Sequence, residues 1–264
     1  MKVALVGFGG LGSIVAAQLA RDTAIRFVAV GARASQRVRI QELLGDIPVV
    51  ESPAALIAQK PELVVECASH DAFRQYAGPV LGAGIDLIAV SVGVLAEAAY
   101  RGEVLATAQR AGATLEIPAG AIGAIDVIAA ARHSGLTRVA YVTRKSPRAW
   151  AGTPAESMID LKAVREPALF FDDTAERAAL LFTEKANVTA TLALAGVGFV
   201  ATRVQFWVDP AVEKSVHHIE AEGPCGTLRL DLANNVAPSD GRASLLTAMS
   251  IVQAVRNRFA VLRL

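Results

Sequence analysis

The stretch KVALVGFGGLGSIVAAQLA, residues 2–20, decides how the chain begins to fold. An apolar run is followed by glycines in the spacing G-x-G-x-x-G and then by a helical pattern of apolar residues. The first glycine permits a tight turn, the second lets a pyrophosphate approach the backbone because it has no Cβ, and the third allows helix and strand to pack closely. Amides at the start of the helix attract phosphates. The predicted cofactor contacts of this turn are Gly7, Gly9, Gly10, Leu11 and Gly12.

The first third of the chain alternates short apolar runs with helical patterns, as expected of a parallel sheet covered by helices on both faces. Strands are expected over residues 2–8, 25–33, 61–69, 85–93 and 113–120. Helices are expected over residues 11–22, 52–60, 70–84 and 97–112. The pattern predicts an α/β fold whose N-terminal part, residues 1–119, is a Rossmann-like, doubly wound parallel sheet that binds a dinucleotide.

From about residue 120 the pattern changes, because strand-like or mixed segments follow one another closely. These segments are residues 137–146, 189–198, 202–210, 215–223 and 226–235. They predict a second, α+β domain over residues 120–242. The last segment has apolar residues at helical spacing, with arginines near its end that suit the helix dipole. We therefore expect a C-terminal helix within residues 243–264 that packs back on the first domain.

Composition excludes several classes of function. The 264 residues include 53% hydrophobic residues, 21 glycines and 5% aromatic residues, which suits a compact Ala/Val/Leu-rich α/β protein. The formal net charge is only +1, with basic and acidic residues interspersed, so we expect no nucleic-acid partner. Cys67 and Cys225 lie far apart without the paired spacing of a zinc site. We expect no metal site and a reduced compartment for both thiols.

The chain shows no secretory or membrane-spanning pattern. Its first residues lack a long apolar segment followed by a small-residue cleavage site. The uncharged span 186–202 contains an asparagine, three threonines and glycines, and is shorter than the ~20 apolar residues that a membrane helix needs. We expect a cytoplasmic protein without a membrane partner.

The end of the second predicted strand bears on cofactor choice. NAD-selective folds usually place Asp or Glu there to hold the ribose diol, but the segment VAVGARASQR, residues 28–37, contains neither. Arg33 stands in that place, and a guanidinium can grip a 2′-phosphate, with Arg37 assisting. We therefore expect NADP to be accepted, and a preference for NADP over NAD is open on this argument. The alternative is a solvated Arg33 that leaves NAD as the working cofactor.

The segment ECASH, residues 66–70, lies where another strand of the parallel sheet ends. In this type of fold the nicotinamide ribose lies at that edge of the sheet. Ser69 is therefore predicted to hydrogen-bond the cofactor. His70 is interpreted as a surface histidine at the start of a helix.

Three segments of the second half carry a family resemblance. They are EIPAGAIGAID (116–126), ANVTATLALAG (186–196) and VDPAVEKSVHHIEAEGPCG (208–226). Joined to the N-terminal glycine motif, they resemble the L-aspartate dehydrogenase family over nearly the whole chain. The resemblance implies a second domain for substrate binding and dimerisation, hence a homodimer. It also implies oxidation of L-aspartate to iminosuccinate with NAD or NADP.

The resemblance also implies roles for single residues. Members carry Asn-x-His-x-Ile after Asp-Pro, and the matching residues here are Ser215, His217 and Ile219, so His217 inherits the catalytic role. His218 falls on a variable position and, on an extended segment, points to the opposite face. Ala121 and Asn187 match positions that hold the nicotinamide end of the cofactor.

The chemistry of this reaction needs a base and cations. The α-amine must be neutral when the hydride leaves, so a group must take a proton, and a histidine near its ordinary pKa of about 6.5 suits that task. The two carboxylates of the substrate need cations or donors. Candidates are Arg144, Lys145 and Arg148 in TRKSPRAW, and Arg242 with Ser244 in GRAS. Lys145 is the first choice, Arg148 and Ser244 are further candidates, and the sequence does not decide among them.

Alternatives remain open at this point. Homoserine dehydrogenase and dihydrodipicolinate reductase share the two-domain plan and also use nicotinamide cofactors. A non-catalytic NAD(P) sensor would keep the glycine turn but would need no base at His217. The imine product would either feed NAD biosynthesis or hydrolyse to oxaloacetate and ammonia.

Overall fold

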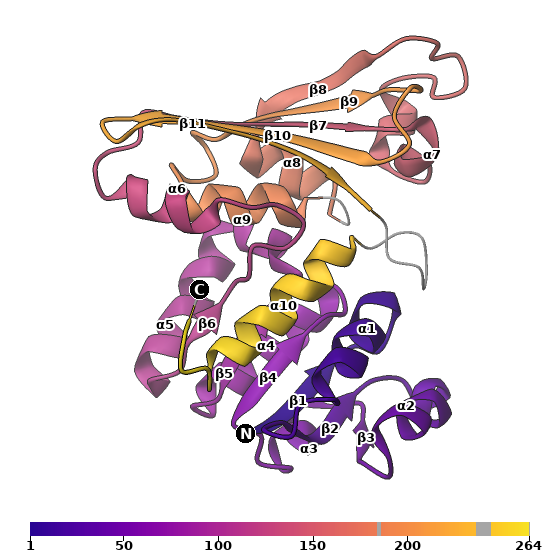
Figure 1. Ribbon diagram of the computed structural model, residues 1–264, viewed down its shortest axis with the longest axis vertical. Helices are drawn as coiled ribbons and strands as arrows, with labels where there is room; N and C mark the ends of the chain where they lie inside the picture. Colours follow the sequence, from indigo (N-terminus) through magenta and orange to yellow (C-terminus); the bar gives the residue numbers. More distant parts are fainter. Residues whose placement is uncertain (184–185, 236–243, 264) are drawn as a thin grey trace.

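The computed structural model describes residues 1–183, 186–235 and 244–263, and it contains two sheets stacked with helices between them (Figure 1). The first sheet has six strands in the order β3-β2-β1-β4-β5-β6, and the second has five in the order β11-β10-β7-β9-β8. All strand pairs of the first sheet are parallel. The predicted fold class, a doubly wound parallel sheet followed by an α+β part, is confirmed.

The strands of the first sheet are short and mostly apolar. They are β1 (Lys2–Val6), β2 (Arg26–Gly31), β3 (Val49–Val50), β4 (Leu63–Glu66), β5 (Asp86–Ala89) and β6 (Leu115–Glu116). In β1 the side chains of Val3 and Leu5 join one buried cluster, and those of Ala4 and Val6 join another. A strand that is buried on both faces needs apolar residues at consecutive positions, which explains the unbroken apolar run at the start of the chain.

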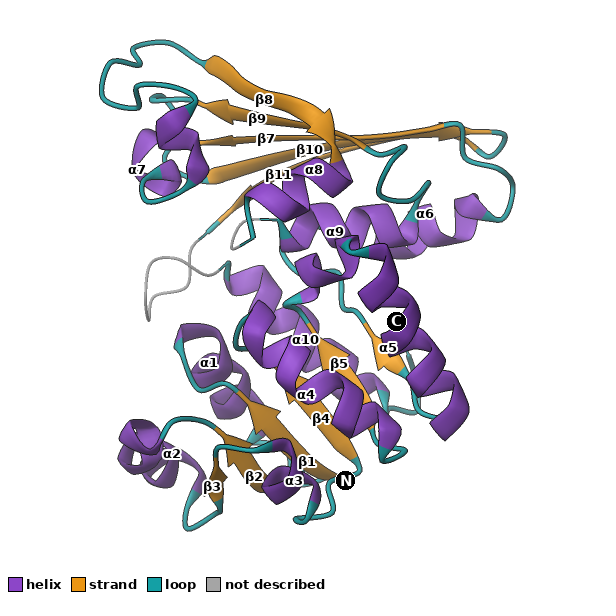
Figure 2. Ribbon diagram, turned by 180° about the vertical axis from the view of Figure 1, so that it is seen from behind, coloured by secondary structure: helices purple, strands orange, loops and turns teal. Residues whose placement is uncertain are grey.

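Helices cover both faces of this sheet (Figure 2). One side carries α1 (Gly10–Leu19), α2 (Arg37–Leu44) and the C-terminal α10 (Leu245–Asn257). The other side carries α3 (Pro53–Ile57), α4 (His70–Gly82) and α5 (Ala98–Ala111). Helix α10 lies against α1, and Ile251 and Val255 of α10 are fully buried there. The end of the chain therefore completes the N-terminal layer.

The second sheet is covered on one face only (Figure 1). Its strands are β7 (Arg138–Lys145), β8 (Ala168–Thr174), β9 (Arg203–Val208), β10 (Ser215–Gly223) and β11 (Gly226–Asn234). Helices α6 (Ile125–Arg132), α8 (Ala175–Leu181) and α9 (Asn187–Ala195) lie against the face that points toward the first sheet. Short elements complete the chain: α7 (Pro147–Trp150), η1 (Ala34–Gln36), η2 (Val92–Ala96) and η3 (Pro154–Ser157).

The prediction of a strand-like or mixed segment over residues 189–198 is wrong, because residues 187–195 form helix α9. Residues 189–193 are all buried, so apolar side chains surround most of the helix. Such a helix has no amphipathic period, and periodicity then cannot separate a buried helix from a buried strand. The helix carries Asn187 at its first turn and therefore places this residue at the junction of the two layers.

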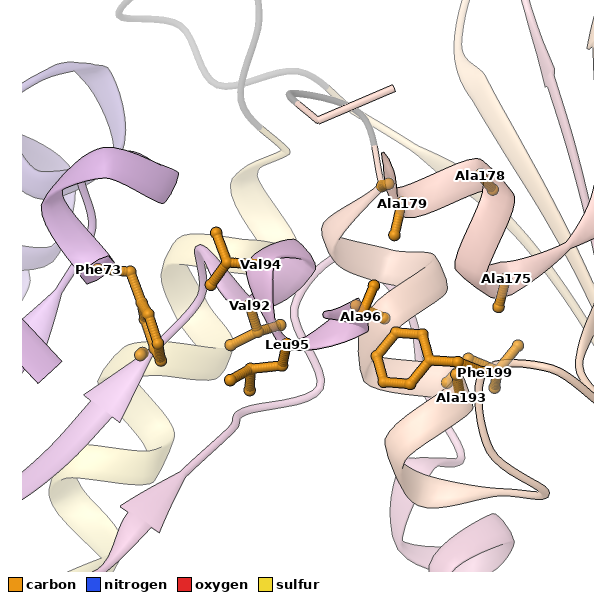
Figure 3. Close-up of a cluster of buried hydrophobic side chains, with 14 of the residues drawn as sticks. Phe73, Val92, Val94, Leu95, Ala96, Ala175, Ala178, Ala179, Ala193 and Phe199 are labelled. Carbon is orange, nitrogen blue, oxygen red and sulfur yellow. The ribbon is translucent and has the colours of Figure 1, made fainter. Parts of the chain in front are cut away.

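An apolar seam joins the two layers (Figure 3). The segment η2, which follows β5, is buried along its whole length. Its side chains pack beside Ala175, Ala178 and Ala179 of α8 and Ala193 of α9. Small alanine side chains let the helices approach closely. The seam therefore fixes where α9 lies relative to the carboxyl ends of β4 and β5.

Among the residues that the structure describes, no helix has both the length and the apolar character needed to cross a bilayer.

Candidate active site

The glycine turn between β1 and α1 has two structural glycines and one that faces open space. Gly7 has φ +92°, and a Cβ there would lie 2.6 Å from the Cβ of Ala68. A Cβ on Gly12 would lie 2.2 Å from the carbonyl oxygen of Gly7. A Cβ on Gly9 would meet nothing within 4 Å. The turn thus leaves room for a ligand at Gly9, which is the arrangement that a pyrophosphate requires.

A cleft of about 690 Å³ opens above this turn, between the carboxyl ends of the parallel strands and helices α8 and α9. Seven of the residues predicted from the sequence line it: Gly9, Gly10, Leu11, Ser69, Ala121, Asn187 and Ser244. They come from both halves of the chain. The buried hydroxyl oxygen of Ser244 lacks a hydrogen-bond partner among the described residues, so the cleft presents a polar atom that a ligand can satisfy.

A second cavity of about 480 Å³ continues the groove on the other side of the turn. It is lined by Gly7 and Arg33, as predicted, and also by Gln36 and Glu51. Gly9 and Ser69 line both cavities, so the two form one groove across the ends of β2, β1 and β4. An extended dinucleotide fits this division, with the adenosine half beside Arg33 and the nicotinamide half in the larger cleft.

The buried carboxylate of Glu66, at the end of β4, binds the backbone of two loops that line the groove. Its oxygens accept hydrogen bonds from the backbone N–H groups of Ala68 (2.7 Å), Ser69 (3.1 Å) and Ser91 (3.0 Å), and from the Ser91 hydroxyl (2.9 Å). Burial raises the pKa of this carboxyl, and the four hydrogen bonds oppose that shift. Glu66 therefore connects the loop after β4 to the loop after β5, a role that no local sequence pattern indicates.

Asn187 is held at the cleft by two groups from the N-terminal half. Its Oδ1 accepts a hydrogen bond from the Gly93 N–H (3.0 Å) and lies 2.9 Å from Nε2 of His70. Because this oxygen only accepts, the arrangement fits the His70 tautomer that carries its proton on Nε2. With its oxygen held in this way, the side chain of Asn187 lines the cleft, where its amide nitrogen can donate to a ligand.

The interpretation of His70 as a surface residue is wrong, because its ring lines the cleft and is partly buried. A Cβ on Gly93 would lie 2.5 Å from Cε1 of this ring, so a side chain at position 93 would displace the ring. His70 is the first residue of α4, directly after the loop that follows β4. That position, at the carboxyl edge of a parallel sheet, is the signal by which the sequence could have pointed to it.

His217 lies elsewhere, on the helix-facing side of β10. It shares that face with Ile219 and Ala221, and its exposed fraction is 4%. Its Nδ1 lies 2.7 Å from the hydroxyl oxygen of Tyr141 on β7. Burial, and then the nearby charge of Lys145, lower the pKa of His217 to about 3, well below the ordinary value expected from the sequence. The ring is therefore neutral near pH 7, while burial raises the pKa of the Tyr141 phenol and keeps it protonated.

The predicted cations lie at the end of β7 and in the short helix that follows it. The Lys145 ammonium, at the end of β7, lies 5.0 Å from the ring centroid of Trp150, and Arg148 lies in α7. Lys145, Arg148 and His217 do not line the 690 Å³ cleft. Arg242 lies outside the described residues. The structure thus brings the predicted cofactor residues other than Gly12 to one groove, and it places His217 and Lys145 outside that groove on the second sheet.

His218 points away from His217, as predicted, onto the uncovered face of the sheet. Its Nδ1 lies 2.8 Å from a carboxylate oxygen of Asp231, and its Nε2 lies 3.4 Å from one of Glu220. These contacts make it a surface residue of the second sheet.

Two family models match the chain. One, described as "Aspartate dehydrogenase, C-terminal", matches residues 126–258. The other, described as "Homoserine dehydrogenase, NAD binding domain", matches residues 7–118. The matched ranges correspond to the second sheet with α10 and to the first sheet with its groove.

Curated relatives match over nearly the full length. An L-aspartate dehydrogenase of Ralstonia nicotianae is 41% identical over 262 residues, which is 98% of this chain and 97% of the relative. An L-aspartate dehydrogenase of Ralstonia pickettii is 40% identical over 260 residues, with the same coverage. The solved aspartate dehydrogenase of Thermotoga maritima has a TM-score of 0.78 at 23% identity and covers 100% of this chain and 99% of its own. At that identity the structural likeness shows the fold.

Proposed function

This chain belongs to the L-aspartate dehydrogenase family, and we propose on that premise that it oxidises L-aspartate to iminosuccinate. It is an NAD(P)-dependent dehydrogenase. The observation that carries the proposal is the 690 Å³ cleft, where the glycine turn meets Asn187 and Ser244 from the second half of the chain. A cleft lined by both halves suits a cofactor on one side and a small substrate on the other.

The residues of the groove fit a nicotinamide dinucleotide. The backbone at Gly9 and Gly10 would hold the pyrophosphate at the start of α1, since no side chain blocks the approach. Ser69 would hydrogen-bond the ribose of the nicotinamide half. Asn187 and Ala121 would hold the nicotinamide end, with the Asn187 oxygen already fixed by Gly93. When bound, the nicotinamide ring accepts the hydride that leaves the α-carbon.

We assign the base role to His217, supported by its protonation state. A pKa of about 3 leaves the imidazole neutral and able to accept a proton at neutral pH. Acceptance at Nε2 requires Nδ1 to carry the proton and donate to the Tyr141 hydroxyl oxygen, which lies at the right distance. The proposal requires the diacid to reach the helix-facing side of β7 and β10. Its carboxylates would then offset the charge of Lys145 and raise the pKa of His217, which makes the histidine a stronger base when substrate is bound.

Lys145 is the first candidate to bind a substrate carboxylate, with Arg148 and Ser244 as further candidates. Lys145 shares the helix-facing side of the sheet with His217 and lowers its pKa, so the two groups are electrostatic neighbours. A substrate with two negative charges compensates that cation in a partly buried site. The imine would then hydrolyse to oxaloacetate and ammonia or would feed NAD biosynthesis.

The decisive test replaces His217 by alanine. Loss of a general base lowers kcat by roughly 10²- to 10⁴-fold, so we expect turnover of L-aspartate to fall by that factor while NAD⁺ binding, measured by titration calorimetry, stays within a factor of a few. His218→Ala is the matched control, because it removes the neighbouring ring on the other face of the same strand. Unchanged turnover in His217→Ala would remove the proposed base. Turnover of L-homoserine in place of L-aspartate by the unmodified protein would favour the homoserine dehydrogenase alternative.

We also propose that the chain forms a homodimer through the uncovered face of the second sheet. Val142, Val216 and Trp207 lie on that face, on three adjacent strands, and are only partly buried in the single chain. These apolar side chains lie among charged residues such as Arg144, His218 and Glu220. Partly buried apolar side chains at the centre of a polar sheet face fit a contact with a second copy of the chain. The expected mass in solution is twice the 27.6 kDa of the chain.

Cytoplasmic localisation remains part of the proposal. Cys67 and Cys225 are both free thiols in the structure, which suits a reducing compartment. Fractionation of the native cells tests it, and recovery of the protein outside the cytoplasmic fraction would contradict it.

A further inference from the structure

We propose that Glu51 is the residue that selects between NAD and NADP, because it supplies the carboxylate that is missing after β2. The inference rests on the proposed cofactor groove and concerns its adenosine end. A carboxylate in that place accepts hydrogen bonds from the ribose diol of NAD and repels the 2′-phosphate of NADP. The consequence is a site that favours NAD although Arg33 stands beside it.

The position of Glu51 follows from the order of the strands. β3 lies beside β2 at the edge of the first sheet, with Val50 opposite Gly31, and Glu51 is the next residue after Val50. In a parallel sheet the carboxyl ends of neighbouring strands meet at one edge. Glu51 therefore reaches the place that an acidic residue after β2 would occupy. Its side chain lines the 480 Å³ cavity together with Arg33.

A hydrogen bond holds the Glu51 carboxylate in this place. Its Oε1 accepts from the backbone N–H of Ala34, at 2.8 Å, in the loop that follows β2. Its charge also reaches Tyr76 across the cavity, where it adds to burial in raising the pKa of the phenol. The carboxylate is thus ordered and faces the cavity from its β3 side.

Gln36 provides an independent sign of the ligand. Its side-chain oxygen is buried in the lining of the same cavity and has no hydrogen-bond partner among the described residues. A buried acceptor without a partner requires a donor. The hydroxyls of a ribose are donors, whereas a 2′-phosphate presents acceptor oxygens. Glu51 and Gln36 together match the diol.

Arg33 acts in the opposite direction. Its side chain is exposed at the mouth of the cavity, where a guanidinium attracts a phosphate. The cavity therefore holds one group that attracts a 2′-phosphate and one that repels it. Removal of either charge is expected to move the preference in a known direction.

The test measures dissociation constants of NAD⁺ and NADP⁺ by titration calorimetry on the full-length protein. Glu51→Gln keeps an oxygen that can accept from Ala34 N–H and removes only the negative charge. We expect the Kd for NADP⁺ to fall at least about tenfold and the Kd for NAD⁺ to rise several-fold. Glu42→Gln is the matched control, since it removes the same charge from the exposed face of α2 outside the groove. Arg33→Ala should raise the Kd for NADP⁺ and leave that for NAD⁺ nearly unchanged.

The possible outcomes distinguish a failure of the role of Glu51 in cofactor selection from a failure of the proposed cofactor groove. An unchanged ratio of the two constants in Glu51→Gln, or an equal change of both, overturns the role of Glu51 while leaving cofactor binding intact. An unmodified protein that binds NADP⁺ more tightly than NAD⁺ also overturns it. If the unmodified protein binds neither nucleotide, the proposed groove fails together with the inference. Thermal unfolding of each variant shows whether the substitution has altered the fold.

Discussion

The groove on the first sheet and the histidine group on the second sheet are assembled in different ways. Backbone atoms of one turn, from Gly7 to Gly12, form the centre of the groove, and no charged side chain is needed there. The second group depends on Tyr141 and His217, which are 76 residues apart in the sequence and meet through strand pairing. The groove is preformed for its ligand, whereas the histidine group holds a buried imidazole whose basicity depends on the charges brought to it. A local motif thus fixes the geometry of the groove, whereas the geometry of the histidine group depends on the tertiary fold.

Two glycine substitutions in the turn after β1 give the largest expected effects, and they separate the structural role of this turn from its role in cofactor binding. Gly12→Val places carbon against the Gly7 carbonyl, where even a Cβ would lie at 2.2 Å, so backbone must move. We expect the free energy of unfolding to fall by on the order of 5 kcal/mol, at the upper end of single substitutions. Gly9→Val meets open space. It should change stability by less than about 1 kcal/mol and weaken NAD⁺ binding at least tenfold, since its side chain occupies the approach of the pyrophosphate.

Chemical denaturation and calorimetric binding on both variants distinguish the two roles. If Gly9→Val destabilises as strongly as Gly12→Val, the open space at Gly9 is filled by protein and not by ligand. If Gly9→Val binds NAD⁺ normally, the pyrophosphate lies elsewhere.

The first sheet and its groove could largely be predicted from the sequence, because the patterns that indicate them are local. The glycine spacing and the apolar run of β1 lie within one short stretch, and the structure confirms the fold that they predict. The position of Glu51 could not be predicted from local sequence patterns. β3 has only two residues and no usable period, so nothing in the sequence places Glu51 beside the end of β2. NAD-selective folds usually carry an acidic residue at the end of the second strand, and we propose that Glu51 of the neighbouring strand takes that place.

The second half was less predictable for two physical reasons. Helix α9 is buried over most of its circumference, so it has the apolar run of a buried strand and no helical period. The pKa of His217 depends on burial beneath the helices and on Lys145, and neither is visible in the segment SVHHIEAEG. The family resemblance, and not a local pattern, points to His217 as the candidate base. Its protonation state could be predicted only from the three-dimensional structure, which shows its burial and its neighbour Lys145.

Measuring the free energy of unfolding as a function of pH tests whether the His217 ring is kept neutral by burial. Its pKa is about 3 in the folded chain and about 6.5 when unfolded, so between these values the unfolded chain binds more protons. The contribution of His217 is fully present above pH 6.5 and is lost as the pH falls toward 3. From pH 7 to pH 5 it should cost about 2 kcal/mol of stability. His217→Asn should remove this part of the acid sensitivity, measured by urea denaturation at each pH.

His218→Asn is the control for that titration, because it replaces the histidine on the exposed face of the same strand. Equal acid sensitivity in the unmodified protein and His217→Asn would show that the His217 ring is not kept neutral by burial.

The smallest change in the stability of the single chain is expected at the uncovered face of the second sheet. Val142→Asp puts a carboxylate at the centre of that face, between His218 and Gln205 on the neighbouring strands. We expect at most about 1 kcal/mol of destabilisation, the span of strand propensities. A charge buried at a two-fold interface is costly, and at such an interface it appears twice. Sedimentation equilibrium should therefore give the mass of one chain for Val142→Asp. It should give that of two chains for Val127→Asp, which makes the same change on the exposed side of α6. A dimer that persists in Val142→Asp would show that the chains associate through a surface other than the uncovered face of the second sheet.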